Sequence, residues 1–344
     1  MKTVTREAAE IDAPTRVLII FPGALGDLMC LLPAIKAIAW RHRGSAIDLM
    51  ARAELARFIV DRIDFVERRS RALSRAHSQA HSIDRREVSA LFKASEEIEG
   101  STCAFFSQFE AIYSFFAADD ANFRRRLSES CSGTVTFHPF RPPGEGHVAA
   151  AYLRSVLSSS SIGALAEFSA IGQISLLEPL KGDLDSAAAR LTALGIEPEN
   201  FVAIFPGSGS TAKNWPAEKF AALATMLAGR AVFVLGPAEA ALAPALGAHR
   251  FAILHSLELG AVAGIARLAR AFVGNDSGAA HLAAAVGARG VVLFGPTDPA
   301  RWGPLGKVAV IRRAPIASIE PAEVHAAICD LELEMGSHRA PKEA

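Results

Sequence analysis

The sequence predicts an α/β protein built from two doubly wound domains, and three observations lead to this fold class. Its 344 residues suit two domains of roughly 150 residues each. The segment FVAIFPGSGS at 201–210 repeats the plan of VLIIFPGALG at 17–26, which is an apolar strand, then Phe-Pro-Gly, then small residues. After the second copy, apolar strands alternate strictly with helical patterns, as in a parallel sheet covered by helices.

The first copy opens a strand–turn–helix–strand unit. Residues 17–21 are a short apolar run that ends at Pro22-Gly23, and LMCLLPAIKAIAWRHR after the turn has apolar residues at helical spacing. AIDLM at 46–50 predicts the second strand, parallel to the first. Residues 68–90 are polar and favour a loop and a surface helix, whereas FFSQFEAIYSFF at 105–116 predicts a later strand or a buried helix.

The apolar pattern weakens across 163–200, so we place the domain boundary there, with a first domain at 1–170 and a second at 171–317. In the second domain, helices in AEKFAALATMLAGR, AVAGIARLARA and SGAAHLAAAVGA alternate with the strands AVFVLGP, RFAILH, AFVGN and GVVLFGP. Residues 318–344 are expected to hold a helix and a tail. Ligands of such sheets bind beyond the carboxyl ends of the strands, which predicts a cleft between the domains.

Composition narrows the function classes. The chain is 51% hydrophobic and 21% charged, and its formal net charge of +0 argues against a general nucleic-acid binder. Residues 41–86 hold 11 Arg but 6 Asp or Glu, which fits either a solvated helical face or a surface for an anionic acceptor or a membrane. Four distant cysteines predict reduced thiols in a cytoplasmic protein. With no signal sequence and no apolar run near about 18 residues, we expect a soluble or at most peripheral protein.

The segment GNDSGAAH at 274–281 places polar residues between an apolar strand and an apolar helix. Ser277 stands at an N-cap position, so the amides of Gly278 and the alanines after it would be free to bind an anion such as a phosphate. Asp276 suits hydroxyl groups on a sugar attached to that phosphate, and His281 could donate to the same region. The alternative is that Asp276 and Ser277 only cap the helix, with His281 a core residue.

The turn PGSGSTAKNWP at 206–216 is a second candidate for phosphate binding. The hydroxyls of Ser208, Ser210 and Thr211 and the charge of Lys213 could contact phosphate oxygens, although the segment lacks the Walker pattern. Trp215, followed by Pro216, is typical of a hydrophobic contact at a helix start.

Two further segments each allow two interpretations. In GALGD, Gly23 and Gly26 permit a tight turn, and Asp27 could be a helix cap or a general base facing the cleft. In LFGPTDPARWGPLG at 293–306, Thr297, Asp298, Arg301 and Trp302 could wall a nucleotide pocket or form a rigid surface loop.

Together, PGALGD, FPGSGSTAKNWP and GNDSGAAHLAAAVGARGVVLFGPTDPARWGP resemble glycosyltransferase family 9, the ADP-heptose:lipopolysaccharide heptosyltransferases and their relatives. The resemblance covers the chain's organisation from Val17 to Gly306, while residues 60–170 match no motif. It implies a GT-B fold, in which two Rossmann-like domains face a central cleft, with the donor mainly on the second domain and the acceptor on the first. It also implies a final helix that crosses back to the first domain.

By position, the resemblance assigns Asp27 as the catalytic base and Lys213 as the phosphate-contacting lysine. It places Asp276, Ser277 and Gly278 in the loop that binds the sugar and diphosphate, followed by His281. It implies inverting transfer of a heptose or related sugar from an ADP-sugar, without a cofactor or an obligatory metal. The acceptor would be a hydroxyl of a lipopolysaccharide core, or of another glycolipid or oligosaccharide, in the cytoplasm with peripheral contact to the inner membrane.

Two rival functions use the same architecture. A sugar-nucleotide 2-epimerase would need several acid and base groups around one bound sugar nucleotide. A non-catalytic nucleotide-sugar-binding protein would keep the pocket but would not need Asp27.

Overall fold

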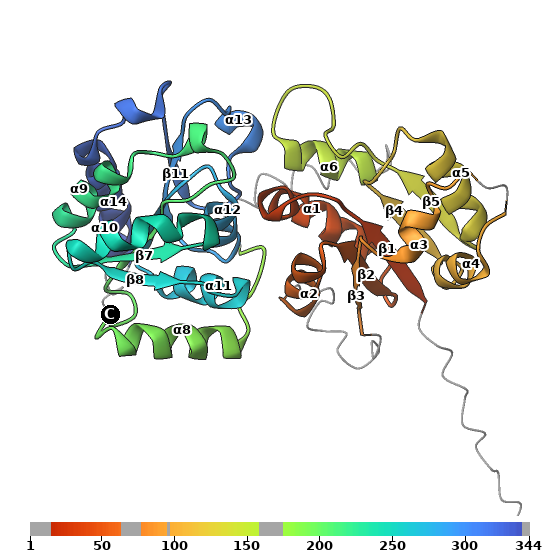
Figure 1. Cartoon of the computed structure of the whole chain (residues 1–344), viewed down its shortest axis with the longest axis horizontal. Coiled ribbons are helices and arrows are strands. Elements are labelled where there is room, and N and C mark those ends of the chain that lie inside the picture. Colours follow the sequence, from red (N-terminus) through yellow and green to blue (C-terminus); the bar gives the residue numbers. More distant parts are fainter. Residues whose placement is uncertain (1–14, 63–76, 95–96, 158–174, 339–344) are drawn as a thin grey trace, which may run out of the picture.

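The computed structural model describes residues 15–62, 77–94, 97–157 and 175–338. It contains two separate parallel sheets, one on each side of the molecule, and each sheet is covered by helices on both faces (Figure 1). The predicted fold class, two doubly wound α/β domains, is confirmed. The predicted boundary at residue 170 lies outside the described residues.

The first sheet has the strand order β3-β2-β1-β4-β5. Its strands are β1 (Arg16–Ile20), β2 (Ala46–Ala51), β3 (Ala80–Ser82), β4 (Ala111–Ser114) and β5 (Thr134–Phe137). The helices are α1 (Leu25–Arg41), α2 (Ala53–Arg62), α3 (Arg86–Ala90), α4 (Gly100–Phe106), α5 (Ala121–Ser130) and α6 (Val148–Val156). One apolar cluster joins the sheet to α1, α2 and α6, and another joins it to α3, α4 and α5.

The second sheet has the order β11-β10-β9-β6-β7-β8. Its strands are β6 (Val202–Phe205), β7 (Ala231–Leu235), β8 (Ala252–His255), β9 (Ala271–Asn275), β10 (Gly290–Phe294) and β11 (Val308–Arg312). Its helices are α8 (Lys181–Ala193), α9 (Ala217–Met226), α10 (Ala243–Ala248), α11 (Leu259–Leu268), α12 (Gly278–Ala285), α13 (Pro299–Trp302) and α14 (Pro321–His338). Counted from β6, this is the Rossmann strand order 3-2-1-4-5-6.

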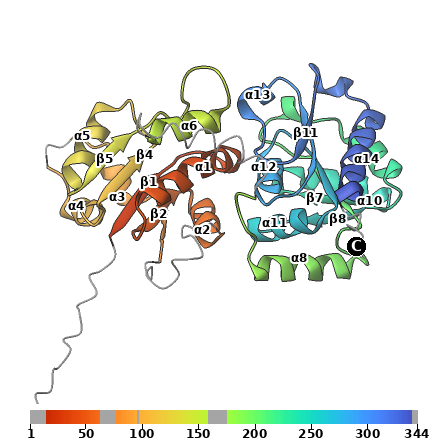
Figure 2. The same cartoon turned by 180° about the vertical axis from the view of Figure 1, so that it is seen from behind.

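Both sheets reverse their strand order at one place, between β1 and β4 in the first and between β6 and β9 in the second. These switch points are where open α/β sheets bind ligands. The three glycine-containing turns singled out in the sequence follow β1, β6 and β9. Both views show α1 and α12 facing each other where the two domains meet (Figures 1 and 2).

Three sequence predictions are corrected or refined. Strand β3 lies within a stretch predicted to be loop and surface helix. The segment 105–116 contains a strand, β4, and only the end of a helix. The predicted C-terminal helix exists as α14, but it does not cross to the first domain, because Val324 and Ile328 on it join the apolar cluster of the second sheet and it contacts α9, β9 and β10.

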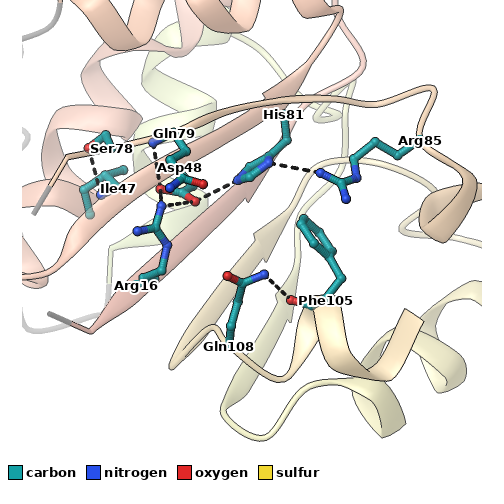
Figure 3. A network of polar contacts seen from close by, with 9 residues as sticks. All are labelled: Arg16, Ile47, Asp48, Ser78, Gln79, His81, Arg85, Phe105 and Gln108. Carbon is teal, nitrogen blue, oxygen red and sulfur yellow. Dashed lines mark hydrogen bonds and ion pairs between the residues drawn. The ribbon is translucent and has the colours of Figure 1, made fainter. Parts of the chain in front are cut away.

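A buried polar cluster ties the amino-terminal half of the first sheet together (Figure 3). Asp48 on β2 has no solvent exposure. Its carboxylate accepts hydrogen bonds from Arg16 at 2.6 Å and from the Gln79 amide at 2.9 Å, and His81 Nε2 lies 2.8 Å from it. Buried carboxylates are tolerated when they are paired in this way, so Asp48 fixes β1, β2 and the approach to β3 in one register.

Candidate active site

A pocket of about 540 Å³ lies where the two domains meet, and we call it the interdomain pocket. Its lining comprises Ala24, Gly26, Asp27, Cys30 and Arg141 from the first domain and Gly209, Ser210, Lys213, Asp276, Ser277, Gly278, His281, Thr297 and Trp302 from the second. Eight of the predicted site residues therefore line one cavity. They are Gly26, Asp27, Ser210, Lys213, Asp276, Ser277, Gly278 and His281.

The turn after β1 delivers Asp27 to the first-domain wall. A Cβ atom on Gly23 would lie 2.4 Å from the Phe21 ring and 2.8 Å from Asp27 Cβ, so only glycine fits this turn. Asp27 is the third residue of α1, and its Oδ2 accepts a hydrogen bond from the Ala24 amide at 3.1 Å. Its other carboxylate oxygen has no hydrogen-bond partner among the described residues. Asp27 is thus a helix cap that also lines the pocket, and the two interpretations are compatible.

The start of α12 forms the opposite wall. Ser277 is the N-cap, as predicted, and its hydroxyl accepts a hydrogen bond from the Ala280 amide at 3.3 Å. That bond removes Ala280 from the donors predicted to bind an anion. The amides of Gly278 and Ala279 have no hydrogen-bond partner among the described residues. They lie at the positive end of the helix dipole, where an anion is stabilised.

Lys213 reaches the pocket from a short 3₁₀ turn (Thr211–Lys213) after β6. Its Nζ lies 2.6 Å from Asp276 Oδ2, and both residues line the cavity. Ser208 and Thr211, also predicted to bind the donor, do not line it. The Ser208 hydroxyl instead donates within its own turn, to the Ser210 carbonyl at 2.7 Å, and so shapes the loop rather than the cavity wall.

His281 links the two domains at the floor of the pocket. Its Nδ1 lies 3.8 Å from Cys30 Sγ on α1, and its Nε2 lies 3.9 Å from Asp276 Oδ1. Burial alone would lower the pKa of His281, but Cys30 and Asp276 outweigh burial and raise this pKa to about 9. These two neighbours therefore favour the protonated imidazole.

Asp276 carries the complementary charge. Burial raises the pKa of its carboxyl group, but His281 and Lys213, together with Thr297, outweigh burial and hold this pKa below its usual value. The lining of the whole pocket then carries three cationic side chains and two carboxylates. The cations are Arg141, Lys213 and His281, and the carboxylates are Asp27 and Asp276. This balance favours an anionic ligand over a neutral one.

Small residues allow the two helix starts to approach. A Cβ atom on Gly278 would lie 3.0 Å from Leu25 Cβ, and one on Gly26 would lie 3.4 Å from His281 Cδ2. These two glycines therefore serve close contact between the domains. The tight turn predicted for Gly23 and Gly26 depends on Gly23 alone.

Of the remaining residues that the sequence singled out, some line the pocket and others hold the surrounding loops and helices in place. Thr297 and Trp302 line the pocket, whereas Asp298 caps α13 through the Ala300 amide at 3.3 Å. Trp215 packs on Phe220 with ring centroids 4.8 Å apart, which confirms the predicted contact at the start of α9.

Asn275 belongs to this second group. It is fully buried, accepts from the Trp215 amide at 3.0 Å and donates to the Pro206 carbonyl at 2.7 Å. Unlike Asp276, Ser277 and His281 in the same segment, Asn275 does not line the pocket. Asn275 holds the turns after β6 and β9 beside each other.

The sequence pattern missed two lining residues on the first domain. Cys30 was interpreted as a structural thiol, and Arg141 belongs to a stretch without a motif. Within the described ranges, no group of three or more His, Cys, Asp or Glu side chains is placed to hold a metal ion. No helix in the described part of the chain is long and apolar enough to cross a membrane.

Comparisons with known proteins give a family match in the second half of the chain. Residues 170–325 match the model of glycosyltransferase family 9 (heptosyltransferase). Lipopolysaccharide heptosyltransferase 1 of Escherichia coli (strain K12) is 30% identical over 142 residues. That match spans 39% of this chain and 44% of the relative, so the chain covers less than half the length of the curated relatives it matches.

Solved structures match over nearly the whole chain and show the fold. The family 9 glycosyl transferase from Veillonella parvula DSM 2008 superposes with a TM-score of 0.71 at 17% identity, over 93% of this chain and 97% of its own. ADP-heptose lps heptosyltransferase II of E. coli gives a TM-score of 0.67 at 18% identity, over 94% and 100%. E. coli heptosyltransferase WaaC with ADP gives 0.61 at 21% identity, over 92% and 100%.

Proposed function

We propose that this chain, whose residues 170–325 match the model of glycosyltransferase family 9, belongs to that family and transfers a sugar from a nucleotide diphosphate donor to the hydroxyl of a glycan acceptor. The observation that carries the proposal is the interdomain pocket. It sets a carboxylate of the first domain, Asp27, and an anion-binding helix start with Lys213 on the second domain around one cavity.

The donor diphosphate occupies the second-domain wall. The amides of Gly278 and Ala279 donate to phosphate oxygens, and Lys213 and protonated His281 stabilise the charge that develops on the leaving diphosphate. Asp276 orients Lys213 through their 2.6 Å contact and accepts hydrogen bonds from sugar hydroxyls. We propose that these cations hold the diphosphate without an obligatory metal.

The acceptor occupies the first-domain wall. Asp27 accepts the proton of the acceptor hydroxyl as that oxygen attacks the anomeric carbon, and the bond from this carbon to the diphosphate breaks on the opposite face. The configuration at the anomeric carbon inverts. Arg141 has no carboxylate within ion-pair distance among the described residues, so an anionic group of the acceptor can pair with it.

We assign ADP-heptose as the donor, because the related structures named above carry ADP or are named for ADP-heptose. The acceptor is a lipopolysaccharide-core hydroxyl or one of another surface glycan. We place the reaction in the cytoplasm, with peripheral contact to the inner membrane where the acceptor is a glycolipid.

Turnover of ADP-heptose with purified core oligosaccharides and glycolipids tests the proposal. We expect acceptor-dependent release of ADP in a one-to-one ratio with glycosylated product, whose new linkage shows the inverted anomeric configuration by NMR. Release of free heptose without any glycosylated product, or retention of configuration, would rule out the mechanism.

Replacing Lys213 should weaken donor binding. We expect Lys213→Met to raise the Kd for ADP by about 10- to 100-fold, because a hydrogen bond to a charged group contributes on the order of 1.5–3 kcal/mol. Calorimetric titration measures this change. The matched control is Lys219→Met, which removes a lysine paired with Glu320 at 2.8 Å on the same domain, outside the pocket lining. Equal Kd values for the two variants would show that Lys213 does not contact the phosphates.

A further inference from the structure

A set of hydrogen bonds clasps the two domains beside the pocket, and we call it the interdomain clasp. His147 Nε2 lies 2.8 Å from the carbonyl oxygen of Gly303, which follows Trp302 in the second domain. The other two contacts come from Arg301 of the second domain. Its guanidinium donates to the Gly146 carbonyl at 2.9 Å and to the Pro142 carbonyl, both in the first domain. Three contacts thus join the loop between β5 and α6 to α13 and the residue after it.

The clasp fixes two residues of the pocket wall. Arg141 lies between Phe140, whose carbonyl accepts from the Tyr152 hydroxyl at 2.6 Å, and Pro142, whose carbonyl accepts from Arg301. The backbone on both sides of Arg141 is therefore held. Trp302, on the facing wall, is held next to Gly303. Neither His147 nor Arg301 lines the pocket itself.

His147 makes two hydrogen bonds, and the two together require the neutral imidazole with its proton on Nε2. It is the N-cap of α6, where its Nδ1 accepts a hydrogen bond from the Ala149 amide at 3.2 Å. Its Nε2 must then carry the proton that is donated to Gly303. This is the neutral imidazole, because a protonated Nδ1 could no longer accept from Ala149.

We propose that His147 is a positioning residue that sets the separation of Arg141 and Trp302 across the pocket, through the hydrogen bond that its Nε2–H donates to the Gly303 carbonyl. The inference does not depend on which ligand occupies the pocket. It concerns how the two domains are held together.

The surroundings of His147 favour the neutral form. Burial lowers the pKa of His147, the Gly303 carbonyl raises it, and the positive charges of His281 on α12 and Arg301 on α13 lower it, with a net result below its ordinary value of 6.5. A lowered pKa means that the neutral form is the one stabilised in the folded chain. Protonation removes the bond that caps α6, because Nδ1 can then no longer accept from the Ala149 amide, whereas Nε2 donates to Gly303 in both forms.

Two substitutions separate the roles of the two ring nitrogens. In His147→Asn, the amide oxygen stands near the position of Nδ1 and can cap α6, but no donor reaches Gly303. In His147→Gln, the amide nitrogen stands near the position of Nε2 and can donate to Gly303, and the side chain does not titrate. A remote exposed histidine supplies the matched control, His255→Asn at the end of β8.

The alkylation rates of two native cysteines measure whether the clasp is closed. Cys30 is 1% exposed and lies against His281 of the other domain, so opening of the domains exposes it. Cys103 is partly exposed within the first domain and provides the reference in the same sample. Alkylation of both thiols, followed by peptide mass spectrometry, gives the ratio of the Cys30 rate to the Cys103 rate.

At pH 7.5 we expect this ratio to rise about fivefold in His147→Asn, since one hydrogen bond contributes on the order of 1 kcal/mol. It should stay at the wild-type value in His147→Gln and His255→Asn. A ratio that is the same in His147→Asn and the wild type, or that rises in His147→Gln as far as it does in His147→Asn, would overturn the proposal.

Discussion

Asp27→Asn should lower kcat by about 10²- to 10⁴-fold, the range that a positioned general base contributes. The substitution removes the carboxylate that we propose accepts the acceptor's proton. It keeps an oxygen that can accept from the Ala24 amide, as Asp27 Oδ2 does at 3.1 Å. The Kd for ADP, measured by calorimetry, should change little, because we propose that the diphosphate binds the second-domain wall.

A matched control separates the chemistry from the capping. Asp120 caps α5 through the Phe123 amide at 2.7 Å and does not line the pocket. Asp120→Asn should leave kcat unchanged. If Asp27→Asn retains the wild-type kcat, Asp27 is a helix cap only and another group must accept the proton.

Asp48→Ala should cost the first domain about 3–5 kcal/mol of stability, because removal of one partner of a buried ion pair leaves the other charge uncompensated. Arg16, which contacts the Asp48 carboxylate at 2.6 Å, is 18% exposed and cannot be fully hydrated in place. His81 and the Gln79 amide lose their acceptor as well (Figure 3). Hydrogen exchange of the β2 amides measures the loss, with β9 peptides as the internal reference.

The surface pair of Lys181 and Asp185 is the control for this result. Their charged atoms are also 2.6 Å apart, but the side chains are 88% and 62% exposed. Asp185→Ala should therefore change stability by roughly 0.5 kcal/mol or less. A loss of the same small size in Asp48→Ala would mean that the buried cluster does not hold the sheet together.

Much of the fold was predictable because its signals are local. The two Phe-Pro-Gly turns end apolar strands, and Ser277 starts a helix at the position where an N-cap belongs. The predicted residues of the second-domain wall follow directly after β6 and β9, and adjacent parallel strands bring their carboxyl ends together. Once β6 and β9 are neighbours in the sheet, these turns bring Lys213 beside Asp276.

Other features depend on contacts that no local pattern encodes. Strand β3 has three residues and is held by pairing with β2 and by the contact of His81 with Asp48, so it lacks an apolar alternation. Cys30 and Arg141 reach the pocket only when the two domains come together. The apolar residues of α14 indicate that the helix has a buried face, but they do not indicate which domain it packs on. The prediction that this helix crosses to the first domain was wrong.

The most direct test of the central claim, that the second-domain wall of the pocket binds an ADP-sugar, is a thermal-shift and calorimetric panel of ADP, ADP-heptose, UDP, GDP and CMP on the purified protein. A ligand at about 100 times its Kd stabilises the protein that binds it by roughly 2.7 kcal/mol. We predict stabilisation by ADP and ADP-heptose, and none by the other three nucleotides at the same concentration. Binding of none of the five, or a preference for UDP, would contradict the assignment of the donor.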